Sequence, residues 1–384
     1  MADTQVVRIA SFNAALNRPA PGGLVEELAG GPSRQAQRLA QIVQLVRPNI
    51  LAVLELDFDG TERAADLFHN DYLMRSWNRS TAIHYPYRRQ FPSNTGIALP
   101  FDLNRDGKIA LPEDAHGFGA HEGQYAFALF SQIPLNFADA RSFRHLRWAS
   151  MPNNLLPTDS EECPTGIPRE AAAVLRLSSK NHVDVPISGS NVHLVIAHPT
   201  PPIFDGPERR NAKRNHDEIR LIADYLAGGE RAAYIVDDSQ RAGGLEEDAE
   251  FVVLGDMNAD PYDGVSHAGA IWQLLRHRRV AASPAYGLLT PSSRGALQNA
   301  DQAMPGMPEA REHERSNPRR GNATFHTTVW KLRVDYVLPS AGLATEQTGV
   351  FWPVAEHQHA HLVAGTSSSD HRLVWADVRL PELW

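Results

Sequence analysis

The sequence predicts a layered α/β fold. Short apolar runs typical of buried strands alternate with amphipathic helical patterns through the first third of the chain, and strand patterns dominate the remainder. Neither an internal repeat nor a low-complexity linker divides the sequence, so we expect residues 1–384 to form one domain. Its long loop insertions are expected at 91–120, 136–168, 199–215 and 280–325, and the first three are interpreted as walls of a pocket.

Composition limits the class of protein. Hydrophobic residues make up 42% and charged residues 21% of the chain, as in a soluble globular protein with a core. No apolar stretch approaches the roughly 20 residues of a transmembrane helix, and the N-terminus lacks the basic and apolar regions of a signal peptide. Cys163 is the only cysteine, which excludes a disulfide within the chain and a thiolate metal site. The net charge of −8 argues against a general duplex-DNA binder.

Periodicity and capping residues define the individual elements. Residues 33–46 place Leu39, Ile42 and Val46 on one helical stripe, with Ser33 as the N-cap and Pro48 as the stop. The other expected helices are 61–72, 208–226 and 265–276. The expected strands are 6–13, 50–54, 124–130, 171–177, 192–197, 251–254, 333–338 and 373–378.

Polar side chains suited to chemistry stand where these strands end. Asn13, Glu55, His198 and Asp256 each fall at the C-terminal end of an expected strand, where sites gather in layered α/β folds. Further groups of this kind, in neighbouring turns, are Asn258, Asp370 and His371. Taken singly, each is also what an ordinary turn or loop contains. Together they supply hard oxygen ligands for a divalent cation and imidazoles for a phosphoryl group, which indicates one metal-assisted site for cutting a phosphate ester.

The order of these motifs resembles the endonuclease/exonuclease/phosphatase superfamily, which includes pancreatic DNase, abasic-site endonucleases, inositol-polyphosphate phosphatases and bacterial sphingomyelinases. The matching segments, of which Gly255-Asp256-Met257-Asn258 is one, are 11–13, 54–55, 124–134, 169–174, 197–198, 255–258, 333–338 and 369–371. The resemblance implies a four-layer α/β sandwich, with two packed mixed β-sheets flanked by helices and the loops of one end gathered around a metal.

The resemblance also implies the metal ligands. Glu55 is expected to be the principal ligand, supported by Asn13 and Asp370. The cation is expected to be Mg²⁺ or Mn²⁺, with Ca²⁺ as an alternative. The sequence departs from the family pattern after Glu55, where Asp57 and Asp59 either add a second metal position or form a solvated turn.

Catalytic roles follow in the same way. Asp256 is expected to orient or deprotonate the attacking water, and Asn258 to hold a phosphoryl oxygen. His371 is expected to contact the phosphoryl oxygens, with its other ring nitrogen held by Asp335. His198 is expected to stabilise the transition state or the leaving oxygen.

Substrate contacts are expected from two places. Tyr125 and Arg169 match family positions that reach phosphate oxygens. The proline-rich segment after His198 is unusual for the family, and its cations Arg209, Lys213 and Arg214 either clamp a phosphate or form the solvated first turn of a helix. This segment favours a small or lipid-derived phosphoester over nucleic acid.

Residues 102–113 match the twelve-residue calcium loop. Its ligand positions carry Asp102, Asn104, Asp106, Lys108 (through its main-chain carbonyl) and Glu113. Prolines before and within the loop argue against a switching helix pair, so we expect a structural Ca²⁺ or, alternatively, a turn rich in Asp and Asn without metal. Calcium loops are common outside the cytoplasm, which favours a periplasmic or secreted mature form.

The sequence thus predicts a divalent-metal-dependent phosphoester hydrolase, most simply a monomer, acting on a small or lipid-derived phosphoester by in-line attack of water. A metal-dependent endonuclease is the first alternative. A non-catalytic member that binds phosphorylated ligands is the second, although such a protein has no need to retain Asp256, Asp335 and His371 together.

Overall fold

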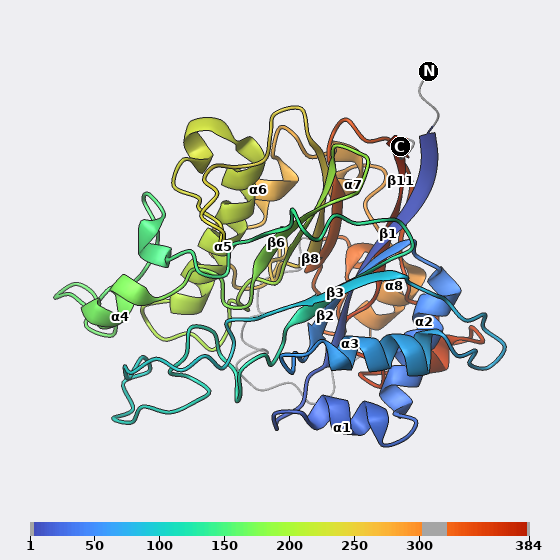
Figure 1. Ribbon diagram of the computed structural model, residues 1–384, viewed down its shortest axis with the longest axis horizontal. Coiled ribbons are helices and arrows are strands. Elements are labelled where there is room, and N and C mark those ends of the chain that lie inside the picture. The colour runs from blue at the N-terminus through green and yellow to red at the C-terminus, as the bar shows by residue number, and fades with distance from the viewer. Residues whose placement is uncertain (1–3, 302–320, 382–384) are drawn as a thin grey trace.

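Two mixed β-sheets packed face to face form the centre of the molecule (Figure 1). The structure is a computed structural model, and it describes residues 4–301 and 321–381. One sheet has six strands in the order β10-β11-β1-β2-β4-β3, and the other has five in the order β5-β6-β7-β8-β9. With helices outside both sheets, this is the α/β sandwich that the sequence predicts.

The strands of the six-stranded sheet are β1 (Thr4–Leu16), β2 (Ile50–Leu56), β3 (Tyr87–Phe91), β4 (Phe127–Ser131), β10 (Thr345–Val350) and β11 (Val374–Pro381). Those of the five-stranded sheet are β5 (Arg141–Ser142), β6 (His182–Pro186), β7 (Val192–Ala197), β8 (Glu250–Asp256) and β9 (Asp335–Pro339). The α-helices are α1 (Gly23–Ala29), α2 (Arg34–Val46), α3 (Arg63–Leu67), α4 (Arg169–Val174), α5 (Arg210–Ala227), α6 (Trp272–Leu275), α7 (Ala282–Tyr286) and α8 (Arg294–Ala300).

Strand alternation directs the site residues toward the space between the sheets. Strands β1 and β2 pack against β8 and β9, and Val252 and Leu254 belong to the apolar core that both sheets share. Because successive side chains of a strand point to opposite faces, Asp256 at the end of β8 points the same way as these two residues. The same alternation places Asp335 on the face of Val337 in β9. The two carboxylates therefore continue the core face at one end of the sandwich.

Helices cover the outer faces of the two sheets (Figure 1). Helix α2 begins as the sequence predicts, with Ser33 Oγ accepting from the N–H of Ala36 at 3.3 Å. Helix α5 lies along the other sheet (Figure 1) and buries Ile219 and Ile222 against Val253 of β8. Among the described residues, no helix is long and apolar enough to cross a membrane.

Two predicted elements are wrong. Residues 171–177 do not form a strand: Ala171 to Val174 belong to α4, since alanine has the highest helix propensity, and the sheet position is taken by β6 further on. The helix expected at 265–276 is reduced to α6, because Gly264 and Gly269 adopt φ values of 82° and 78°, outside the right-handed helical region.

Candidate functional site

A cavity of about 440 Å³ opens where the ends of both sheets meet. The predicted site residues that line it are Glu55, Tyr125, Asp256, Asn258, Asp370 and His371. Of the four long loops, 199–215 contributes Pro201, Pro202 and Ile203 to the wall, whereas no lining residue comes from 91–120 or 136–168. Three loops were expected to form the walls, and only the loop 199–215 does so at this cavity. The part of the 280–325 loop from 302 to 320 lies outside the described residues.

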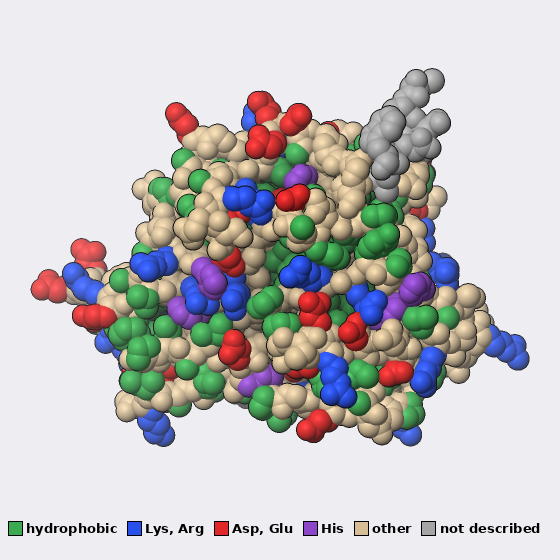
Figure 2. Space-filling view, in the orientation of Figure 1, with side chains coloured by type: hydrophobic (Ala, Val, Ile, Leu, Met, Phe, Trp, Pro, Cys, Tyr) green, Lys and Arg blue, Asp and Glu red, His purple; other side chains and the backbone are tan. Residues whose placement is uncertain are grey.

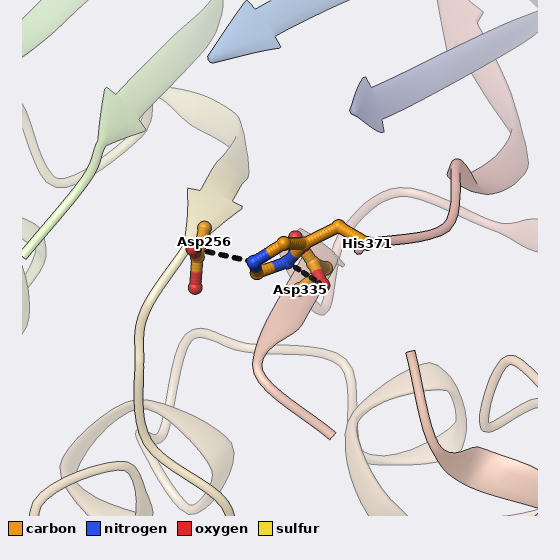
Figure 3. A group of neighbouring side chains, drawn as sticks. All are labelled: Asp256, Asp335 and His371. Carbon is orange, nitrogen blue, oxygen red and sulfur yellow. Dashed lines mark hydrogen bonds and ion pairs between the residues drawn. The ribbon is translucent and has the colours of Figure 1, made fainter. Parts of the chain in front are cut away.

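His371 lies between two buried carboxylates (Figure 3). Its Nδ1 is 2.9 Å from Asp335 Oδ2 and its Nε2 is 3.7 Å from Asp256 Oδ2. The same oxygen of Asp335 accepts a hydrogen bond from Thr327 Oγ1 at 2.7 Å, which fixes the carboxylate. One edge of the imidazole is covered by Trp330, whose ring centre is 5.1 Å away at an angle of 84°. The imidazole therefore has one orientation, with Nε2 toward the cavity.

The protonation of this group follows from its charges. Burial lowers the pKa of His371, but the carboxylates of Asp335 and Asp256 outweigh it and raise this pKa well above the ordinary value. Burial raises the pKa of Asp335 to about 6, against the lowering effect of His371. Burial also acts to raise the pKa of Asp256, yet His371 and His198 bring it below its usual range. At neutral pH the group is an imidazolium between two carboxylates.

Asn13 joins Asp256 to Glu55. Its Nδ2 donates to Asp256 Oδ2 and to Glu55 Oε1, both at 3.1 Å, while its Oδ1 accepts from the N–H of Ala15 at 3.2 Å. The other oxygen of Glu55 accepts from Asn17 Nδ2 at 2.8 Å. In this arrangement the amide nitrogen of Asn13 faces the two carboxylates and donates to both. The predicted role of its amide oxygen as a metal ligand therefore requires a rotation of the amide group.

Glu55 and Asp370 offer the chemistry of a hard-cation site. Burial and the negative charge of Asp370 raise the pKa of Glu55 to about 7. Like charges held together in a partly closed cavity are costly without a positive counter-charge. Both side chains line the cavity, and a divalent cation prefers such oxygen ligands. The donor set therefore fits the metal that the sequence predicts.

His198 approaches the same oxygen of Asp256 as His371 does. Its Nε2 lies 3.4 Å from Asp256 Oδ2, and both side chains are buried. Burial, reinforced by the positive charge of Lys180, lowers the pKa of His198 to about 4, so this imidazole is neutral at pH 7. Its Nδ1 is buried and has no hydrogen-bond partner among the described residues.

Asn258 ties two loops of the site together. Its backbone N–H donates to Asp256 Oδ1 at 2.9 Å and its Nδ2 donates to the carbonyl of Pro199 at 3.1 Å. The residue adopts φ 50°, which Asn tolerates better than most side chains. Asn258 therefore orients Asp256 while its side-chain oxygen remains available at the cavity.

Two of the cations predicted for substrate binding lie elsewhere. Arg169 is exposed on α4, where its Nε donates to the carbonyl of Asp159, and it is not among the residues that line the cavity. Arg214 is buried and donates to three backbone carbonyls, those of Leu177, Arg176 and His116. Its guanidinium fixes the path of the chain, so the interpretation of Arg214 as a phosphate clamp is wrong. Arg169 begins helix α4 and does not stand at the end of a strand, which is why it lies away from the cavity.

The remaining cations are peripheral. Arg209 is exposed and donates to the carbonyl of Val265, a wall residue, at 2.8 Å. Lys213 is half-buried on α5 and does not line the cavity.

Sequence reasoning missed Asn17, which donates to Glu55, and Lys180, whose pKa burial lowers against the raising effect of the charges of Glu55 and Asp256. For Lys180 the missing signal was strand β6, which begins two residues after it, whereas a strand was expected at 171–177.

The predicted calcium loop is closed by hydrogen bonds from its main-chain N–H groups to carboxylate side chains. Asp102 accepts from the N–H groups of Asp106 and Gly107 at 3.2 and 2.9 Å. Glu113 is exposed, and its neighbour Asp114 is the buried acid that accepts from backbone N–H groups of the loop. Calcium at this loop stays a prediction.

The residues that the structure describes contain one group of three side chains placed closely enough for a metal, namely Asp256, Asp335 and His371, with ligand atoms within 4.8 Å of one another. Within this group, Asp335 accepts hydrogen bonds from His371 and Thr327. Glu55 and Asp370 are further carboxylates that line the cavity.

Comparison with known proteins agrees with this architecture. The sequence profile of the Endonuclease/Exonuclease/phosphatase family matches residues 10–371, and no match was found among curated protein sequences. A solved endonuclease/exonuclease/phosphatase from Beutenbergia cavernae DSM 12333 is similar, with a TM-score of 0.50 and 15% identity over 99% of this chain and 72% of that one.

Two further solved structures show weaker similarity. The catalytic domain of human Nocturnin has a TM-score of 0.45 and 14% identity, covering 98% of this chain and 96% of that one. Sphingomyelinase C from Streptomyces griseocarneus has a TM-score of 0.44 and 14% identity, covering 97% and 99%.

Proposed function

Because the chain belongs to the endonuclease/exonuclease/phosphatase family, whose members are generally metal-dependent phosphoesterases or nucleases, we propose that it hydrolyses a small or lipid-derived phosphoester with the help of a divalent cation. The observation that carries this proposal is the row of Asp335, His371 and Asp256, of which His371 and Asp256 line the cavity. A protein that only binds a ligand does not need an imidazolium whose charge and orientation are fixed by two buried carboxylates.

The cation would be held by Glu55 and Asp370, with Asn13 beside them. A divalent ion at this place supplies Lewis-acid charge that polarises a phosphoryl oxygen. The low pKa of Asp256 makes it a weak base, so its role is to orient the attacking water by accepting a hydrogen bond. His371 then donates from Nε2 to a phosphoryl oxygen, and the charge that develops there strengthens this bond.

We assign His198 to the other end of the reaction. As a neutral imidazole it has one N–H, and its Nε2 approaches the same oxygen of Asp256 that His371 approaches. Turned from this carboxylate to the substrate, that N–H would donate to the leaving oxygen. Asn258 donates one Nδ2 hydrogen to the carbonyl of Pro199, and its second Nδ2 hydrogen would donate to a phosphoryl oxygen without adding charge.

The cavity wall favours a leaving group with apolar surface. Apolar or aromatic side chains around its mouth are Tyr125, Pro201, Pro202, Ile203, Val265, Trp330 and Leu332. Duplex DNA requires rows of cations for its phosphates. On the face shown in Figure 2, basic side chains are instead scattered among acidic ones, and the net charge is −8. The endonuclease is therefore the alternative outcome of the same experiment.

A panel of phosphoesters crossed with a panel of metals tests the proposal. The substrates are p-nitrophenyl phosphate, its bis-ester, a phospholipid, an inositol phosphate and plasmid DNA. We expect turnover of a small or lipid ester with Mg²⁺ or Mn²⁺, its loss in EDTA, and its loss in Asp256→Ala and His371→Ala. Asp71→Ala, which removes an exposed acid paired with Arg75, serves as the control. Folded protein without turnover of any ester would refute the proposal, and turnover of DNA alone would establish the nuclease.

A further inference from the structure

Two arginines face each other at the edge of the five-stranded sheet. Arg147 and Arg176 are opposite residues of an antiparallel bridge, which lies beyond the paired ends of β5 and β6. The residue after Arg147 donates its N–H to the carbonyl of the residue before Arg176 at 2.9 Å, and the residue after Arg176 donates to the residue before Arg147 at 2.8 Å. A pair flanked in this way is a non-hydrogen-bonded pair, in which opposite side chains stand closest. Like charges at such a position repel each other.

In the part of the chain that the structure describes, no acid is paired with either arginine. Arg147 is exposed and Arg176 is half-buried, and neither guanidinium has a described carboxylate oxygen within 4.0 Å. The guanidinium of Arg147 makes no hydrogen bond within 4–301 and 321–381. That of Arg176 makes one, from Nη1 to Oδ1 of Asn94 at 2.6 Å. Since each guanidinium has five N–H donors, most donors of the pair are left for a ligand or for water.

A third arginine is held next to the pair. Nδ2 of Asn94 donates to the carbonyl of Arg144 at 2.7 Å, while Oδ1 of the same side chain accepts from Arg176. Nδ2 of Asn94 also donates to the carbonyl of Ser178 at 2.8 Å, and this amide is fully buried. Burial and the positive charge of Arg144 lower the pKa of Arg176, in agreement with this proximity. One buried amide therefore fixes Arg176 and the backbone of a neighbouring cation.

The acids in the neighbourhood do not pair with these arginines. Asp238 accepts from Oγ of Ser142 at 2.6 Å and from the backbone N–H of His145 at 2.8 Å. Glu122 is exposed on another loop. The charges of both acids act to raise the pKa of Arg176, but from beyond 4.0 Å, and burial and Arg144 outweigh them. They reduce the repulsion between the arginines without satisfying their hydrogen-bond donors.

The arginine pair lies at the same end of the sandwich as the catalytic cavity. It precedes β6, whose first residue, His182, is opposite Ala197, the residue before His198. Neither arginine lines the cavity. Only β7 lies between β6 and β8, which ends at Asp256, so two strand spacings of roughly 10 Å in total separate these strands. A group bound at the pair is therefore separate from the catalytic centre.

Two opposed guanidinium groups suit a phosphate group. A guanidinium donates two parallel hydrogen bonds to a phosphate, and a phosphate dianion balances the charge of two cations. A carboxylate offers one charge and two oxygens, and the row of phosphates in duplex DNA requires a row of cations. We propose that Arg147 and Arg176 form a binding site for a single phosphate group outside the catalytic cavity. This site goes beyond the proposed phosphoesterase function and does not depend on it.

Inorganic phosphate in EDTA tests the site without turnover. We would measure its dissociation constant by titration calorimetry. In Arg147→Gln and Arg147→Glu we expect phosphate affinity to fall about ten- to hundredfold. Arg147→Lys keeps the charge without the planar fork and is expected to recover part of the affinity. The matched control is Arg89→Gln, which removes an exposed arginine from the edge strand β3, where the opposite residue is Leu129. This variant should bind phosphate as the wild type does.

Thermal melts provide a second measurement, which a purely structural role of Arg147 would not reproduce. Without phosphate, Arg147→Gln removes the repulsion and Arg147→Glu replaces it by attraction to Arg176. The melting temperature is therefore expected to rise by about 1–2 °C in both variants. Phosphate should raise the melting temperature of the wild type and leave that of the two variants unchanged. Because Arg147 is exposed, its replacement leaves the core intact.

Vesicles show where the phosphate group comes from. Sedimentation with vesicles of phosphatidic acid in phosphatidylcholine, lost in Arg147→Gln and competed by inorganic phosphate, would identify a lipid headgroup. Phosphate binding through Arg147 without vesicle binding would identify a soluble phosphorylated compound, and both results support the site.

Three results would overturn the site. They are the absence of phosphate binding by the wild type, an affinity of Arg147→Gln within about twofold of the wild-type value, and binding of plasmid DNA through Arg147 without binding of inorganic phosphate. None of these measurements uses turnover. A protein that hydrolyses no ester but binds phosphate through Arg147 would therefore retain this site and refute the phosphoesterase function alone.

Discussion

Nδ1 of His371 lies 2.9 Å from an oxygen of Asp335, and the two side chains are 3% and 0% exposed. The residues are 36 positions apart in sequence, one at the start of β9 and the other in the turn before β11. Their contact fixes the orientation of the ring and keeps it protonated through the neutral range, which leaves Nε2–H directed at Asp256 and the cavity.

Replacing Asp335 by Asn therefore separates two effects of this residue on His371, namely the orientation of the ring and the negative charge that keeps it protonated. Asparagine keeps the shape and accepts from Thr327, but it removes the carboxylate that raises the pKa of His371. We expect kcat at pH 7 to fall about 10²- to 10⁴-fold, and the pH optimum to move to lower pH, where His371 regains its proton. The measurement is the pH–rate profile with Asp377→Asn, an acid paired with Arg8 in the far part of the sheet, as control. An unshifted profile would contradict the assigned role.

Glu55 should lower stability at high pH when no metal is bound. Folding raises its pKa from 4.5 to about 7, so the folded protein holds the proton more tightly than the unfolded chain. This contribution to stability is complete below pH 4.5 and is lost as the pH rises through 7. In EDTA at pH 8, Glu55→Gln is therefore expected to be more stable than the wild type, by on the order of 2 kcal/mol, and equal to it at pH 4.

The same pair of proteins tests the metal assignment. Adding Mn²⁺ at pH 8 should raise the melting temperature of the wild type and leave Glu55→Gln nearly unchanged, since the variant lacks the principal ligand. Thermal melts with and without Mn²⁺ measure the change in melting temperature, and denaturant titrations measure the free energies of unfolding of the two proteins. A variant that Mn²⁺ stabilises as strongly as the wild type would place the cation elsewhere.

Arg214 should matter for stability and not for phosphate binding. Its guanidinium joins three segments through the carbonyls of Leu177, Arg176 and His116. Arg214→Met leaves these acceptors buried, at an expected cost of about 2–4 kcal/mol. The exposed Arg209→Met, which loses one hydrogen bond, should cost less than about 1 kcal/mol. Urea denaturation measures both free-energy changes. An unchanged midpoint for Arg214→Met would show that its three hydrogen bonds to backbone carbonyls are not needed for stability.

The loop around Asp102 gives a calcium test. The carboxylate of Asp102 already accepts two N–H groups of its own loop, which is how the first ligand of a calcium loop is held in place. If Ca²⁺ binds, the melting temperature should rise with Ca²⁺ and not with Mg²⁺, and Asp102→Ala with Asp106→Ala should abolish the rise. A calcium response that survives the double substitution belongs to the cavity, and no response at all means that the loop is a turn closed by hydrogen bonds.

Local pattern was sufficient for much of the fold. Strands β7 and β8 carry the apolar runs 194–197 and 251–254, and helix α2 begins after a capping serine, so their positions are readable without tertiary information. Prediction from local pattern failed where apolarity favoured a strand and residue propensity favoured a helix. The alanines after Arg169 fit a buried strand by apolarity but a helix by propensity, and the misplacement of that strand hid Lys180.

What the sequence by itself determined was the type of chemistry: hard oxygen ligands, amides and imidazoles at the ends of strands that alternation directs to a common face. Only the tertiary structure decided how they pair. The pKa values of Glu55 and His371 depend on carboxylates far away in sequence. Charge interactions act through space over a few ångströms, and the packing of the two sheets sets those distances, which no local pattern records.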